Sequence, residues 1–281
     1  MRWTKGHGTQ NDFVVIPDPD GALCLSPDFV AAVCDRRSGL GADGVLRVVR
    51  SACEPDAGPA AHGAEWFMDY RNADGSVAEM CGNGVRVFAR YLVASGLADA
   101  GELAIATRGG VKQVSFDDDG RITVDMGAAQ LPPALAELSV AVGTRRWDAL
   151  GVLMPNPHAV AFVEDLDVAG PLLDPPDVTP RGSFPEGVNV EFAARVGTRH
   201  LAMRVFERGS GETRSCGTGA CAVMVAAARL EGLTGPSTWT VDVPGGRLTV
   251  AEREDGRVLL TGPAVLVASG ALDRDWLAAV S

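Results

Sequence analysis

The sequence predicts an α+β protein of two pseudo-symmetric domains, each a mostly antiparallel sheet wrapped around a central helix. Three observations predict this fold. The pattern Cys-Gly-x-Gly occurs twice, 135 residues apart (216 − 81). Two further short matches follow each copy in the same order. Each copy also leads into one long helix-like run that is flanked by short strand-like runs.

The repeated segments indicate an internal duplication. Each match alone is weak, because Gly-Gly and Asp-Gly are common turn dipeptides. Three matches in one order, with a slip of one residue between offsets of 135 and 136, are difficult to attribute to chance. The pairs are Cys81-Gly82-Asn83-Gly84 with Cys216-Gly217-Thr218-Gly219, Gly109-Gly110 with Gly245-Gly246, and Asp119-Gly120 with Asp255-Gly256.

Each half contains the same predicted elements. The two Asp-Gly turns lie between β-prone segments and predict tight hairpins. The second helix is apolar nearly all round, as expected of a helix enclosed by a sheet. The predicted strands are Phe13–Ile16, Gly44–Val49, Glu65–Asp69, Ala159–Val163, Val188–Phe192 and Leu201–Glu207, and the predicted helices are Val85–Val93 and Ala220–Leu230.

The domain boundary is predicted near residue 126. The halves are then 1–126 and 127–263, and residues 264–281 are a candidate for returning to the first half. Two stretches are predicted to be surface loops, Glu54–Gly63 and the proline-rich Pro171–Gly187.

Composition and charge exclude several classes of function. The net charge of −11 argues against nucleic acid or an anionic membrane surface as a partner. No apolar run approaches the roughly 20 residues that span a bilayer. The N-terminus has no apolar signal core, so a cytoplasmic location is expected. The six cysteines include no Cys-x-x-Cys pair, which disfavours a zinc site and fits a reduced state.

Cys81 and Cys216 are the candidate reactive groups. Each precedes a predicted helix, where unpaired backbone N–H groups and the helix dipole favour a thiolate. Two such thiols facing each other across a cleft could carry a proton from one face of a carbon to the other. The N–H groups of residues 82–84 and 217–219 can bind a carboxylate or a developing oxyanion.

For either copy alone, the alternative is a strand-to-helix turn with a buried thiol. The other cysteines are predicted to serve packing only: Cys24, Cys34, Cys53 and Cys221.

Three asparagines lie beside predicted strands, at positions 11, 156 and 189. An isolated asparagine is more often a turn or capping residue than a ligand contact. Asn156 is the most unusual, because prolines on both sides restrict its conformation. His7 and His158 are candidate bases or metal ligands, although a structural hydrogen bond is favoured for His7.

Taken together, these stretches resemble the diaminopimelate epimerase family. The resemblance implies a cofactor-free amino-acid epimerase with its active site in the interdomain cleft. It also implies conversion of L,L-diaminopimelate to meso-diaminopimelate, serving lysine and peptidoglycan precursor synthesis, in a homodimer. The matching segments are Lys5–Phe13, Cys34–Gly44, Met68–Arg86, Asn156–His158, Gly187–Glu191 and Glu207–Gly219.

The resemblance also assigns roles by match of motif. Cys81 and Cys216 form the catalytic pair, one removing the α-proton as thiolate and the other delivering a proton as thiol. Glu207 pairs with an ammonium group and His158 supports it; neither cofactor nor metal takes part. The backbone at Gly82, Asn83, Gly217 and Thr218 holds the α-carboxylate, and Asn11, Asn72, Asn156, Asn189 and Arg208 grip the substrate.

Two positions depart from the family pattern. Pro155 stands where the family often has glycine, and Gly44 stands where many members have glutamine. Neither departure removes a proposed catalytic group.

Three other functions compete with this interpretation. A proline racemase or hydroxyproline epimerase shares the paired cysteines, but usually has histidine where this chain has Asn83. A thiol–disulfide redox protein is disfavoured by the absence of Cys-x-x-Cys. A non-enzymatic scaffold has no need to retain both cysteines.

Overall fold

A computed structural model describes residues 1–280 of the chain. The chain divides into two compact units. Unit 1 comprises Met1–Val124 together with the chain from Gly262 onward, and unit 2 is Asp125–Thr261. The halves predicted above end two residues later at both places, after residues 126 and 263. Residue 281 of the predicted returning segment lies outside the described residues.

Unit 1 is a sheet that surrounds helix α2 (Gly82–Ala94). Helices α1 (Pro27–Cys34) and α4 (Arg274–Val280) pack against each other elsewhere in this unit. Its strands are β1 (Arg2–Gly8), β2 (Asn11–Pro17), β3 (Gly44–Arg50), β4 (Trp66–Asn72), β5 (Glu102–Thr107), β6 (Gly110–Phe116) and β18 (Val265–Ala271), and β7 (Ile122–Ala128) runs across the boundary.

Unit 2 surrounds helix α3 (Gly217–Leu230) in the same way. Its strands are β8 (Leu138–Val142), β9 (Arg145–Leu153), β10 (Pro157–Phe162), β11 (Asp177–Thr179), β12 (Asn189–Gly197), β13 (His200–Glu207), β14 (Gly211–Thr213), β15 (Ser237–Val243), β16 (Gly246–Glu252) and β17 (Arg257–Gly262).

The two units repeat one strand topology. In unit 1, β2 pairs with β3 in parallel, β3 with β4 antiparallel, β4 with β5 in parallel and β5 with β6 antiparallel. In unit 2 the same series runs through β10, β12, β13, β15 and β16. In each unit the central helix precedes the fourth strand of its series. The fold is therefore a duplicated α+β architecture with mostly antiparallel pairing, as predicted.

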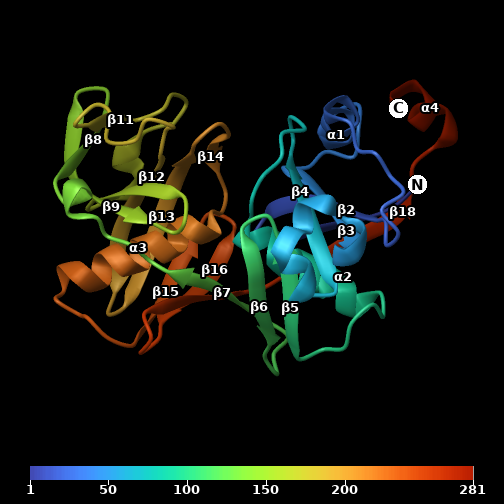
Figure 1. Ribbon diagram of the computed structural model, residues 1–281. Helices are drawn as coiled ribbons and strands as arrows, with labels where there is room; N and C mark the ends of the chain where they lie inside the picture. The colour runs from blue at the N-terminus through green and yellow to red at the C-terminus, as the bar shows by residue number, and fades with distance from the viewer. Residues whose placement is uncertain (281) are drawn as a thin grey trace. The chain divides into compact units, whose positions relative to one another are not determined.

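The two central helices are both buried but differ in composition. Alanine, the best helix former, dominates α3, and every residue from Gly217 to Ala228 is buried. In contrast, α2 carries a fully buried arginine, Arg86, among apolar side chains. Each helix contacts strands of its own unit (Figure 1). These strands are β1–β5 and β18 for α2, and β9, β10, β12, β13, β15 and β16 for α3.

Most predicted elements are confirmed, and the differences are local. Both central helices begin three residues earlier than predicted, at Gly82 and Gly217. The Asp-Gly hairpins join β6 to β7 and β16 to β17, with Gly120 and Gly256 at φ of 75° and 77°. Such angles are readily adopted only by glycine.

Three expectations about the rest of the chain need correction, although both predicted loops lie mostly at the surface. The predicted loop Glu54–Gly63 contains a 3₁₀ segment, Pro55–His62, whose first turn is capped by the Glu54 carboxylate. The predicted loop Pro171–Gly187 contains strand β11, which pairs with β8. Cys24 and Cys53 are exposed rather than buried. The first stretch forms a local turn because the Glu54 side chain caps it, and the second forms a strand because β8 satisfies its backbone groups.

The C-terminal segment of the described chain lies in unit 1. Strand β18 pairs with β1 antiparallel, and Trp276 and Leu277 of α4 pack against the apolar cluster that includes α1. None of the helices in residues 1–280 has the length and apolar character needed to cross a bilayer.

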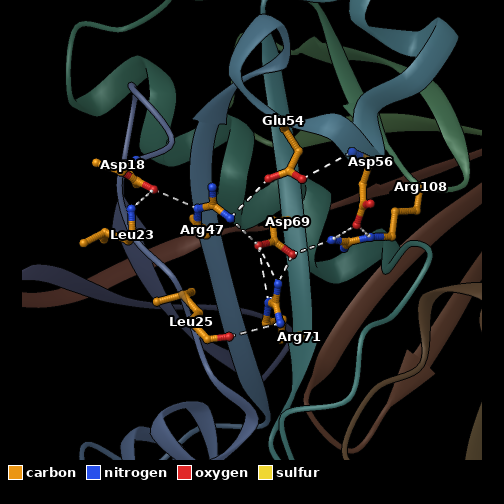
Figure 2. Close-up of polar contacts among 10 residues, drawn as sticks. Asp18, Leu23, Leu25, Arg47, Glu54, Asp56, Asp69, Arg71 and Arg108 are labelled. Carbon is orange, nitrogen blue, oxygen red and sulfur yellow. Dashed lines mark hydrogen bonds and ion pairs between the residues drawn. The ribbon is translucent and has the colours of Figure 1, made fainter. Parts of the chain in front are cut away.

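A buried network of charges lies on one face of β3 and β4 (Figure 2). Its centre is Asp69, which is fully buried. Asp69 forms ion pairs with Arg47 at 3.0 Å, Arg108 at 2.8 Å and Arg71 at 3.3 Å. Arg47 stands opposite Asp69 across the two strands and also contacts Asp18 at 2.9 Å. The network therefore joins residues that are far apart in the sequence through one buried carboxylate.

Candidate active site

Both cysteines of the duplicated pattern are helix N-caps. Cys81 precedes α2 with φ −139° and ψ 119°, and Cys216 precedes α3 with φ −120° and ψ 117°. Each sulfur accepts a hydrogen bond from the third amide of its helix, Gly84 or Gly219, at 3.4 Å. The predicted position of both thiols at helix N-termini is thus confirmed, and the two sulfurs occupy equivalent places in the two units.

Asn11 is the side chain that joins the Cys81 cap to its surroundings. Its Oδ1 lies 3.5 Å from Cys81 Sγ and 3.2 Å from Asn83 Nδ2, while its amide nitrogen donates to Asp43 at 2.8 Å. The turn before Asn11 contains two residues, Thr9 and Gln10, with positive φ. The turn between β1 and β2 therefore directs Asn11 toward the cysteine.

Asn83 is buried and is fixed by two partners. Its Oδ1 accepts a hydrogen bond from Arg86 Nη2 at 2.9 Å, and its Nδ2 donates to Asn11. Asn72, at the end of β4, donates to Ser76 Oγ at 3.0 Å within the connection that leads to α2. Asn11 and Asn83 therefore lie together at the Cys81 cap, and Asn72 lies in the segment that precedes it.

Cys216 lies in a more enclosed and more acidic environment. Its side chain is 5% exposed and its Sγ lies 3.4 Å from Thr218 Oγ1. Burial raises the pKa of this thiol well above its usual range, and the negative charges of Glu207 and Glu191 raise it further. The two hydrogen bonds to the sulfur act in the opposite direction but are outweighed. These effects favour the thiol form of Cys216, against the thiolate that a helix N-terminus alone favours.

Glu207 and His158 are polar residues of the group that includes Cys216. Burial raises the pKa of Glu207, against hydrogen bonds from Thr213 and Cys216. His158 is fully buried between two side-chain oxygens, with Nδ1 2.6 Å from Glu191 Oε1 and Nε2 3.1 Å from Asn156 Oδ1. The structure thus brings Asn156, His158 and Glu207 of the predicted set together with Cys216.

Glu191 is a member of this group that the sequence analysis did not single out. It is fully buried on β12, two residues after Asn189, the parallel partner of His158. A Cβ at Gly219 would lie only 2.7 Å from Glu191 Oε1. The carboxylate can therefore lie this close to the first turn of α3 only because residue 219 is glycine. A glutamate inside an apolar strand was the available signal, because such a charge is rarely buried without a partner.

Asn189 and Arg208 form a separate contact in unit 2. The Asn189 Oδ1 accepts a hydrogen bond from the Arg208 backbone N–H at 2.9 Å, and Arg208 Nη1 donates to the Glu186 carbonyl at 2.8 Å. Asn189 therefore fixes the end of β13, directly after Glu207.

The two departures from the family pattern are compatible with the backbone. A Cβ at Gly44 would lie 2.5 Å from the Arg71 carbonyl oxygen, so this conformation of β3 and β4 requires glycine there. Pro155 is exposed, and the residues around it close a turn in which Met154 N–H donates to the Asn156 carbonyl at 2.9 Å. In the part of the chain that the structure describes, no three metal-binding side chains gather into a candidate metal site.

Glu207→Gln is expected to lower the pKa of the Cys216 thiol. The substitution removes one of the two charges that oppose its ionisation, while the larger effect of burial remains. Because Glu207 must be ionised to act, the difference should be present only above its own raised pKa. The measurement is the rate of iodoacetamide modification of the Cys216 peptide against pH, by mass spectrometry.

The exposed Glu231, paired with Arg195, provides the matched control. Glu231→Gln should leave the Cys216 profile unchanged. A Glu207→Gln profile that coincides with the wild type, or moves to higher pH, contradicts this account of the thiol.

The amino-acid sequence is similar to those of known proteins over nearly its whole length. The sequence model of the diaminopimelate epimerase family matches residues 3–132 and 151–267. The chain is 63% identical to a diaminopimelate epimerase of Streptomyces coelicolor, covering 100% of this chain and 98% of that protein. It is 52% identical to one from Thermobifida fusca, covering 96% and 97%.

Solved structures share the fold at low identity. A PhzF-family phenazine biosynthesis protein from Bacillus anthracis superposes with a TM-score of 0.67 at 17% identity, covering 97% of this chain and 99% of that one. A hydroxyproline epimerase from Agrobacterium vitis superposes with a TM-score of 0.65 at 14% identity, covering 100% and 98%. The extent of the family match and the identity to its members over their full length show that this chain belongs to the diaminopimelate epimerase family.

Proposed function

We propose that this protein epimerises L,L-diaminopimelate to meso-diaminopimelate without a cofactor, using Cys81 and Cys216 as the two proton-transfer groups. The observation that carries the proposal is the pair of sulfur N-caps on equivalent helices of a duplicated fold. Membership of the family supports the choice of substrate.

The proposed chemistry needs strong stabilisation of negative charge. Removal of the weakly acidic α-proton places charge on the α-carbon and its carboxylate. The first-turn amides of α2 and α3 are donors with the helix dipole behind them, which suits this charge. One cysteine takes the proton as thiolate and the other gives its proton to the opposite face, so the reaction requires both sulfurs to reach one carbon.

The surroundings of the two cysteines suit unequal roles. The Cys216 thiol is held protonated by burial and by the charges of Glu207 and Glu191, which fits a proton donor. For the reverse direction it must lose that proton, and binding of a substrate ammonium group near Glu207 offsets the charge that opposes ionisation. This is the role proposed for Glu207 and His158, while Asn11, Asn72, Asn156, Asn189 and Arg208 remain the proposed contacts to the rest of the substrate.

Two accompanying expectations belong to this proposal. A cytoplasmic location fits the chemistry, because the reaction needs free thiols and all six cysteines are free. A homodimer that binds neither nucleic acid nor membrane is proposed from the family resemblance alone.

Incubation with L,L-diaminopimelate in deuterated water, without added cofactor, is expected to give meso product that carries deuterium at the inverted carbon. The physical reason is that a thiol exchanges its proton with solvent before it delivers it. Product stereochemistry and label are read by chiral chromatography with mass spectrometry. Proline and hydroxyproline serve as control substrates.

Turnover of proline or hydroxyproline in preference to diaminopimelate would support the rival racemase function. Product that never gains label would contradict transfer by two separate groups.

A further inference from the structure

The two glycine turns of the duplicated fold make the same contact with the two cysteine caps. In unit 1 the Gly109 N–H donates to the carbonyl of Glu79 at 3.0 Å, and in unit 2 the Gly245 N–H donates to the carbonyl of Arg214 at 2.8 Å. Glu79 and Arg214 each precede their cysteine by two residues. Both turns join the strand after the central helix to the next strand, β5 to β6 and β15 to β16.

The turn in unit 1 is held by a side chain that links it to the buried network. Arg108 Nη2 lies 2.8 Å from Asp69 Oδ1, and its Nε donates to Asp56 at 2.8 Å (Figure 2). Its guanidinium also lies 5.5 Å from the centre of the Phe67 ring. Asp69 and Phe67 belong to β4, the strand whose chain continues into the Cys81 cap. Arg108 therefore joins the turn to the origin of the segment that carries the cysteine.

The position of Arg108 includes one contribution that is unfavourable to stability. Arg108 Nη1 is buried and has no hydrogen-bond partner among the described residues. An unpaired buried N–H opposes folding, whereas the ion pairs with Asp69 and Asp56 favour the observed position of the guanidinium. In unit 2 the equivalent turn is held by a side-chain hydrogen bond instead of ion pairs, since Arg214 Nη2 donates to the Pro244 carbonyl at 3.0 Å. The backbone contact is therefore shared by both units, while the side chain that secures it differs.

We infer that Arg108 is a positioning residue for Cys81: it anchors the glycine turn whose backbone holds the chain just before the cap. The inference rests on the proposed function for the role of Cys81. Close contact supports it, since a Cβ at Gly109 would lie 3.2 Å from Met80 Cβ, directly beside the cysteine.

Arg108→Gln is the test, with steady-state kinetics on L,L-diaminopimelate and amide hydrogen exchange measured by mass spectrometry. We expect kcat to fall by about ten- to a hundredfold, because small displacements of a reacting group have effects of this size. KM should change much less than kcat. Amide exchange should rise at Gly109 and in residues 82–84, and stay at the wild-type level in residues 217–219.

Two further variants separate positioning from general stability. Arg108→Lys keeps a cation for Asp69 and should recover part of kcat. Gly109→Ala leaves the ion pairs intact but presses on Met80, so it should also lower kcat. Arg121→Gln, at an exposed ion pair in the next hairpin, is the matched control and should match the wild type.

Wild-type exchange in residues 82–84 of the Arg108→Gln protein, or a kcat within twofold of the wild type, overturns the inference. Should Arg108→Gln fail to fold, the Gly109→Ala protein decides it by the same two measurements. If the wild-type protein does not epimerise diaminopimelate, the proposed function fails, and the exchange comparison still decides whether Arg108 orders the cap.

Discussion

Cys81→Ser and Cys216→Ser are each expected to lower kcat for epimerisation by about 10²- to 10⁴-fold, the size of a lost acid–base group. A serine hydroxyl has nearly the shape of the thiol and can still cap the helix. It does not ionise in the working range of pH, so it cannot remove an α-proton. Because each variant leaves one cysteine intact, the loss in both shows that one thiol cannot do the work of two.

The measurement is circular dichroism of the change from L,L to meso substrate, with thermal unfolding followed on the same samples. Cys24→Ser is the matched control, since it removes an exposed thiol in unit 1 and should turn over normally. Turnover within tenfold of the wild type in either cap variant, with the fold intact, contradicts the two-base proposal.

Asp69→Asn is expected to lower the free energy of unfolding by about 3–5 kcal/mol, as does the loss of one partner from a buried ion pair. The carboxylate is fully buried and faces Arg47, Arg71 and Arg108. The amide removes the charge that balances three cations. Arg47 retains Asp18 and Glu54, and Arg108 retains the more exposed Asp56, so the penalty falls mainly on Arg71.

Urea unfolding at neutral pH, followed by circular dichroism, measures this effect. Asp20→Asn is the control, because Asp20 is 85% exposed and its pair with Arg50 should contribute less than about 1 kcal/mol. A loss from Asp69→Asn that is no larger than that of the control would show that the buried network is not a source of stability.

The duplicated sequence pattern predicts the fold because it repeats the parts that local chemistry decides. Cys-Gly-x-Gly sets the start of a helix, Asp-Gly sets a hairpin, and β-prone runs between them set strands. All of these are confirmed in both units. Both helix starts were predicted three residues late, because two glycines in each first turn, Gly82 and Gly84 or Gly217 and Gly219, lower helix propensity although the cap itself begins the helix.

The sequence predicts most residues of the candidate site, but it does not predict how their charges affect the ionisation of Cys216. The N-cap position of Cys216 correctly follows from sequence, and a thiolate was expected from it. Burial and the charges of Glu207 and Glu191 favour the thiol form instead. Both depend on which strand lies beside which, and no local pattern states that β12 runs parallel to β10. The network around Asp69 was missed for the same reason, since its members come from separate strands and turns.

The fully buried Arg86 of α2 has a consequence for how the two halves relate. The position 135 residues later, on α3, is Cys221, which is also fully buried. A helix transplanted from the first half into the second would bring a guanidinium into a space shaped for a small thiol. The two central helices are therefore no longer interchangeable. We expect that recombination between the two halves of the gene, which places α2 in the position of α3, gives a chain that does not fold.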